Sequence, residues 1–233
     1  SMESKMSVIL KVASWTFWNN FSNMKLRQIK DFLCKNRLQA LCILNGVVLA
    51  VGLVVAMLLS DDNRWTNWSL SRLGETTSNR LSAFSFNSGV FLSGLIMVTI
   101  GFFMNRGYLK LGQIRSARIS GWTLSLFAIC MIGVALCPND TMHAAHFVFS
   151  RGIVILMVLL MFLLPSSLSY LTHRERISSF SFPIFATIIA AQGYAMGKFW
   201  FVIVEVLLGI FATIWLVLIC RRMELKLSDL KTS

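Results

Sequence analysis

Residues 39–59 read QALCILNGVVLAVGLVVAMLL, an apolar run that carries no charge. As a helix this run is about 30 Å long, which matches the hydrocarbon core of a bilayer. Five further runs of similar length follow at 86–104, 118–137, 146–170, 179–196 and 199–220. The fifth is the weakest, because Pro183, Gln192 and Gly193 interrupt it. Five or seven spans are alternatives, but six fits the charges best. The sequence predicts an all-α, polytopic integral membrane protein with a six-helix transmembrane bundle.

The composition also indicates that the bilayer is the solvent. Of the 233 residues, 56% are hydrophobic and only 14% are charged, and the mean hydropathy is +0.69, whereas a soluble domain of this length needs a more charged surface. Lys and Arg outnumber Asp and Glu by 22 to 10. In a membrane protein such an excess is typical of cytoplasmic flanks that face anionic lipid, so no nucleic-acid partner is predicted.

The positions of Lys and Arg predict the orientation in the membrane. Seven lie in the first 37 residues, and others follow the second, fourth and sixth runs: Arg106, Lys110 and Arg115; Arg174 and Arg176; Arg221, Arg222, Lys226 and Lys231. The opposite connectors hold fewer, and Asp61, Asp62 and Glu75 dilute them. The positive-inside rule therefore predicts a protein of the cell (plasma or inner) membrane with both termini in the cytoplasm. Segments 60–85 and 138–146 then face outward.

The apolar runs divide the chain into three parts. Residues 1–37 form a basic cytoplasmic segment, 38–222 the transmembrane domain with its outer loop at 60–85, and 223–233 a cytoplasmic tail. Within the first part, apolar residues at helical spacing alternate with basic ones, which predicts an amphipathic helix in the membrane interface. This helix either contacts anionic lipids or serves only as a basic flank that sets the topology.

Polar side chains gather at or near the predicted outer ends of the spans. Asn87, His143, His146 and Gln192 lie at or near these ends. Arg151 lies about one and a half turns deeper on its helix, and Glu205 lies about six residues into the last span. Burial of a charge in hydrocarbon costs free energy, so each charged group needs a partner. Arg151 and Glu205 both lie roughly 8–10 Å below the outer boundary at 1.5 Å per residue. We therefore predict that these two side chains pair inside the bundle.

This polar layer predicts an outward-facing pocket for a lipid headgroup or another small anionic ligand. Arg151 would capture the anion, Asn87 and His143 would orient it, and the 60–85 segment with Arg72 would cover it. Glu205, His146 and Gln192 would complete the lining, and membrane lipids would be the partners.

Two other functions stay open. His143 and Asp140, with or without Ser69 as nucleophile, are residue types that a membrane-embedded hydrolase or acyltransferase of lipids could use. The other alternative is that the protein is a helical scaffold or a partner-binding membrane subunit. A metal at His143 and His146 would need Asp140 or Glu75 as a further ligand, and we predict neither a metal nor a cofactor. The five cysteines lack metal or redox spacing and are predicted to pack in the core.

Short motifs at the second and third spans resemble a known family. They are SLSRLGE (69–75), FNSG (86–89), LSG (92–94) and GVALCPND (133–140) followed by His143. This set is similar to the six-span membrane family of domain of unknown function 998, which is distantly similar to the Frag/DRAM/Sfk membrane proteins. The resemblance covers roughly residues 40–220.

The resemblance mainly implies the architecture, which is six transmembrane spans. The eukaryotic Frag/DRAM/Sfk relatives further imply a connection with membrane lipids. By matching position it also implies a candidate site at Ser69, Ser71, Gly74, Asn87, Asp140 and His143. The basic segment before residue 38 lies outside the resemblance.

Overall fold

The chain folds into six long helices in the part that the structure describes. This computed structural model describes residues 36–61, 65–66, 69–196 and 198–232. The helices are α3 (Arg37–Leu58), α4 (Arg80–Lys110), α5 (Ile114–Leu136), α6 (His143–Ser167), α7 (His173–Met196) and α8 (Lys198–Thr232), and the short 3-10 helix η2 (Leu70–Gly74) precedes α4. The described residues contain no strand. The predicted all-α fold is confirmed. The interfacial helix predicted in residues 1–37 lies almost entirely outside the described residues.

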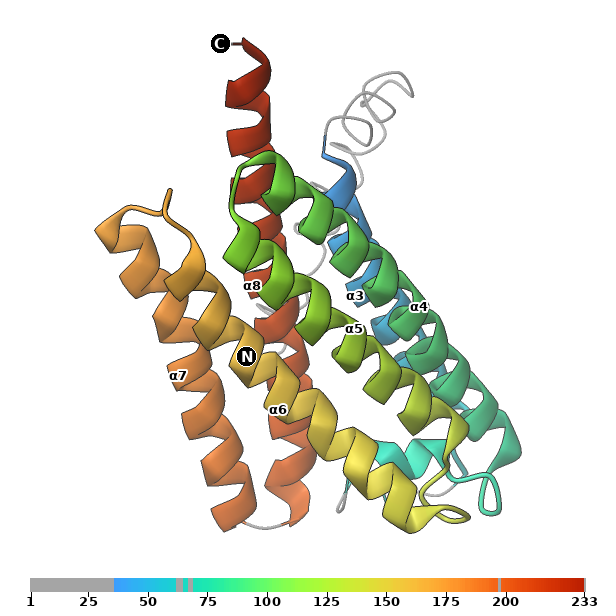
Figure 1. The fold of residues 1–233 in the computed structure, drawn as a ribbon. Coiled ribbons are helices and arrows are strands. Elements are labelled where there is room, and N and C mark those ends of the chain that lie inside the picture. The colour runs from blue at the N-terminus through green and yellow to red at the C-terminus, as the bar shows by residue number, and fades with distance from the viewer. Residues whose placement is uncertain (1–35, 62–64, 67–68, 197, 233) are drawn as a thin grey trace, which may run out of the picture. The chain divides into compact units, whose positions relative to one another are not determined.

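Each helix from α4 onward packs on the next along the chain, and α4 also contacts α8 (Figure 1). From α4 onward, short connections make consecutive helices antiparallel, so the bundle has two ends. We call the end with residues 59–61, 65–66, 69–79 and 137–142 the loop end. The other, which we call the terminal end, holds the connections at 111–113 and 168–172.

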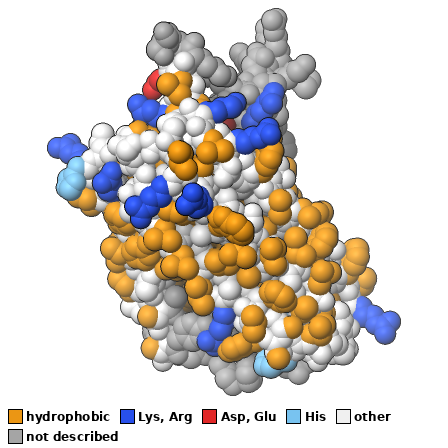
Figure 2. Space-filling view, in the orientation of Figure 1, with side chains coloured by type: hydrophobic (Ala, Val, Ile, Leu, Met, Phe, Trp, Pro, Cys, Tyr) orange, Lys and Arg blue, Asp and Glu red, His pale blue; other side chains and the backbone are white. Residues whose placement is uncertain are grey.

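Five of the helices are long and apolar enough to cross a membrane: α3, α4, α5, α6 and the Val202–Leu230 part of α8. Large apolar side chains such as Leu58, Phe84 and Trp122 are exposed, as a lipid-facing surface requires. Figure 2 shows apolar side chains across the middle of the visible face, with Lys and Arg gathered mostly toward one end. The predicted helical membrane protein is therefore confirmed.

Helix α7, the fifth of the six in chain order, is not among the five candidate spans found in the described residues. It corresponds to the interrupted fifth run, with charged residues in its first turn and Pro183 inside it. The sequence therefore predicted six helices correctly, while five of them qualify as spans among the described residues.

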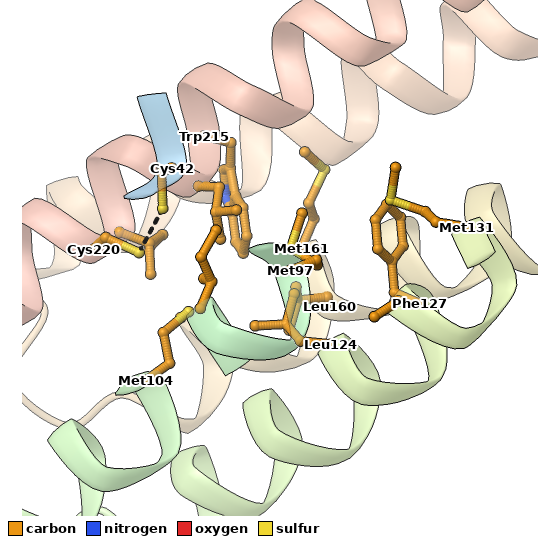
Figure 3. Close-up of a cluster of buried hydrophobic side chains, with 14 of the residues drawn as sticks. Cys42, Met97, Met104, Leu124, Phe127, Met131, Leu160, Met161, Trp215 and Cys220 are labelled. Carbon is orange, nitrogen blue, oxygen red and sulfur yellow. Dashed lines mark hydrogen bonds between the residues drawn. The ribbon is translucent and has the colours of Figure 1, made fainter. Parts of the chain in front are cut away.

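The core of the bundle consists of flexible sulfur-containing and aliphatic side chains. Met104, Leu124 and Met161 are almost fully buried, and Trp215 of α8 lies in the same cluster (Figure 3). Cys42 of α3 and Cys220 of α8 are free thiols whose sulfur atoms lie 3.4 Å apart in this core. Their burial agrees with the packing role predicted for the cysteines.

Helix α4 begins at Arg80, six residues before the apolar run that predicted it. Asn79 caps the helix, because its side-chain oxygen accepts a hydrogen bond from the Ser82 backbone N–H at 3.2 Å. The segment expected as a loop to residue 85 therefore ends at residue 79, and residues 80–85 belong to a helix face.

Two glycines allow α3 and α4 to approach closely near the loop end. A Cβ on Gly52 would lie 2.8 Å from the Gly89 Cα and 3.3 Å from the Ser85 carbonyl oxygen. The Ser85 hydroxyl donates a hydrogen bond to the Gly52 carbonyl at 3.1 Å. Backbone atoms occupy this contact, so a side chain at either glycine requires the helices to separate.

We expect Gly52→Ala to destabilise the protein by about 1–3 kcal/mol, which is the usual cost of an overpacked contact. Thermal unfolding of the purified protein in detergent measures this effect as a lower Tm. Gly209→Ala is the matched control, because nothing lies within 4 Å of a Cβ at Gly209. Equal Tm values for the two variants would contradict the close contact.

Candidate functional site

Residues 69–79 cover the loop end of the bundle and are attached to two helices. The Leu70 N–H donates to Glu205 Oε2 of α8 at 2.7 Å. The Ser82 hydroxyl donates to the Leu73 carbonyl at 3.0 Å, and the Asn87 amide donates to the Gly74 carbonyl at 3.2 Å. Because α4 and α8 hold this segment through its backbone, its position is set by hydrogen bonds as well as by apolar packing.

The connection between α5 and α6 also holds residues 69–79 in place through hydrogen bonds. Asp140 Oδ2 accepts hydrogen bonds from the Thr77 N–H and hydroxyl, each at 2.7 Å, and a longer one from the Thr76 hydroxyl at 3.4 Å. Beside it, the Asn139 amide donates to Glu75 Oε1 at 3.2 Å. Arg72 Nε lies 3.9 Å from the same Glu75 oxygen. The two loops therefore form one polar network.

The network favours an ionised Asp140. Burial raises the pKa of its carboxyl, but the hydrogen bonds from Thr77 and Thr76 stabilise the charged form more strongly. The pKa of Asp140 therefore lies below its ordinary value of 3.8. Oδ1 is buried and has no hydrogen-bond partner among the described residues.

The two histidines have different surroundings. His143 is exposed and its Nδ1 lies 2.8 Å from Asn139 Oδ1. His146 is buried, with Nδ1 2.8 Å from the Cys137 carbonyl and with Nε2 unpartnered among the described residues. The described residues contain no cluster of three or more His, Cys, Asp or Glu that could hold a metal.

The catalytic arrangement suggested by the sequence is not assembled. His143 contacts Asn139, whereas Asp140 is bound to Thr77, so these two predicted partners do not hydrogen-bond to each other. The Ser69 hydroxyl lies 2.7 Å from that of Ser71. Asp140 and His143 have different partners because the turn before α6 directs Asp140 toward residues 69–79.

The predicted ion pair between Arg151 and Glu205 is not formed either. The Arg151 guanidinium carbon lies 4.0 Å from the centre of the Phe147 ring on its own helix, and Arg151 is exposed. Glu205 accepts its hydrogen bond from Leu70 instead. Gln192 is exposed on α7. Of the proposed ligand-binding residues, only Asn87 lines the cavity described next.

An open cavity of about 720 Å³ lies at the loop end of α4. Its described lining consists of Thr76, Thr77, Arg80, Ala83, Phe84, Asn87 and Ser88. The α4 residues repeat every three or four positions, so they share one helix face. Arg80 was not predicted as a site residue, because residues 80–85 were assigned to the loop. The Asn79 cap followed by this spacing is the signal that identifies the face.

We expect Asp140→Asn to lower Tm at neutral pH, because the ionised carboxylate is the stronger acceptor for Thr77. A group with a lowered folded-state pKa contributes stability above its unfolded-state pKa, and this contribution is lost as the pH falls through the folded-state value. Wild-type Tm should therefore decrease below about pH 4, with a smaller decrease in the variant. Asp61→Asn, at an exposed position of the same end, is the control. Parallel pH profiles for wild type and Asp140→Asn would contradict the role of the carboxylate.

A family model described as a protein of unknown function, DUF998, matches residues 43–222. No curated protein and no solved structure matches the chain. The matched region contains the cavity, both loops of the polar network and most of the helical bundle. The match thus covers most of the chain, in agreement with the motifs of its second and third spans, and the protein belongs to the DUF998 family.

Proposed function

We propose that the protein binds an anionic group, such as a phosphate headgroup, in the loop-end cavity. The observation that carries this proposal is Arg80, which is charged, whereas no described lining residue is acidic. A guanidinium matches the oxygens of a phosphate through two parallel hydrogen bonds. The Ser88 hydroxyl and the second N–H of the Asn87 amide add neutral donors around it.

The acidic residues of the two loops do not oppose this proposal. Asp140 is not among the described lining residues, and its Oδ2 already accepts hydrogen bonds from Thr76 and Thr77. Glu75 is buried and lies against Arg72 and Asn139. Arg80 itself is exposed, and none of the ion pairs found between described residues involves it. Its charge is therefore available to a ligand.

We also propose that the protein lies in a cell membrane with its loop end outside and both termini in the cytoplasm. The basic residues at the terminal end support this orientation; they lie on the last turns of α4 and the first turns of α5 and α7. In this orientation the cavity opens toward the headgroups of the outer leaflet.

Arg80→Gln should weaken binding of glycerol 3-phosphate by about tenfold or more, because charge-assisted hydrogen bonds to phosphate are lost. Isothermal titration of the purified protein measures this, with glycerol as the uncharged control ligand. Arg151→Gln is the matched variant, since Arg151 lies over Phe147 and outside the cavity. A wild-type affinity in Arg80→Gln, or an equal loss in both variants, would count against the cavity as the anion site.

The orientation has its own test. In a variant whose native cysteines are replaced by alanine, Thr141→Cys should react with a membrane-impermeant maleimide in intact cells. Gly112→Cys should react only after lysis, because Gly112 lies in the turn at the terminal end. The reverse labelling pattern would overturn the proposed topology.

A further inference from the structure

We propose that the ligand of the cavity is a membrane lipid and that one of its acyl chains lies in a second groove, between α3 and α4. This inference rests on the proposed anion site and extends it from a headgroup to a whole lipid. The groove has a volume of about 510 Å³. Its lining is almost wholly apolar and includes Val47, Val48, Val51 and Val55 of α3 and Phe84 and Leu92 of α4.

The cavity and the groove are continuous along one face of α4. Phe84 and Ser88 line both of them, and Arg80 lies one turn before Phe84. From Arg80 to Ser88 the helix rises about 12 Å. A cation at the loop end is thus followed, toward the middle of the helix, by an apolar channel. A lipid has the same order, with an anionic head followed by a hydrocarbon chain.

The groove is largely apolar although two serines, Ser85 and Ser88, line it. Gly52 and Gly89 bring the helix backbones together and provide no side chain to fill the space. The Ser85 hydroxyl is used by the Gly52 carbonyl, at 3.1 Å. What remains along the groove is mainly the methyl groups of valines on α3, which offer no hydrogen bond to a polar ligand.

The position of the groove favours an acyl chain over a free anion. Its α3 lining belongs to a helix that is long and apolar enough to span a membrane, so an occupant there is surrounded by hydrocarbon. A free anion would use only the polar cavity. A chain attached to the headgroup would fill both spaces, each of which has a size typical of ligand pockets.

The groove would contribute to the affinity for lipid mainly through van der Waals packing. The hydrophobic effect contributes little, because a lipid tail is already in apolar surroundings before it binds. We therefore expect selectivity for chain length, with a change in affinity of about fivefold when the groove is blocked. The headgroup interaction at Arg80 should be independent of this change.

The experiment titrates the full-length protein in detergent with dioleoyl phosphatidylglycerol or with its dihexanoyl analogue, and native mass spectrometry counts the bound lipids. Val51→Trp fills the groove from α3. Val54→Trp is the matched control on the same helix, because both valines are similarly exposed, at 56% and 52%, but Val54 lines neither space. Leu92→Trp fills the groove from α4 and serves if Val51→Trp does not fold.

The expected result is that wild type and Val54→Trp prefer the long-chain lipid, whereas Val51→Trp loses this preference and still binds glycerol 3-phosphate. An unchanged preference in both groove-filling variants overturns the acyl-chain site while leaving the anion site intact. The anion site is tested separately with glycerol 3-phosphate, because only Arg80→Gln should reduce the affinity for this ligand. If Arg80→Gln and wild type bind glycerol 3-phosphate and the phosphatidylglycerols with equal affinity, the proposed function itself fails.

Discussion

Asp140 connects the two loops at the loop end of this bundle through a single carboxylate oxygen. That oxygen accepts the N–H and the hydroxyl of Thr77 and a longer bond from Thr76, so a segment with little regular structure is held against α4. The cavity depends on this connection, because Thr76 and Thr77 form one side of it and α4 the other. A loop outside the hydrocarbon can satisfy its backbone with water, so its order has to come from specific bonds of this kind.

The helices could be predicted from the sequence because the bilayer imposes one requirement on every span. Backbone groups in hydrocarbon must pair within their own helix, and an uncharged run such as 39–59 therefore becomes a helix with few alternatives. The ends of helices obey other rules. The start of α4 depends on the Asn79 side chain, which hydropathy does not register, so the apolar pattern placed this start six residues too late.

The candidate site was harder to predict because depth along a helix does not specify the direction of a side chain. Arg151 and Glu205 have matching depths, yet one lies over Phe147 and the other binds a backbone N–H of η2. A prediction that pairs side chains by charge does not consider backbone N–H groups as partners. Asn87, a predicted pocket residue, lines the cavity, whereas Arg80 was not predicted because it was assigned to a loop and its helical spacing to Asn87 was not considered.

Helix α8 carries a carboxylate–amide bond near each end of the bundle. Glu205 accepts from Leu70 above the loop end, and Glu224 Oε1 accepts from the Leu38 N–H at 2.7 Å, at the start of α3. The two glutamates are separated by about 28 Å of helix. Because α8 is one continuous helix, it fixes the distance between these two contacts, so a single element sets the positions of both η2 and the start of α3.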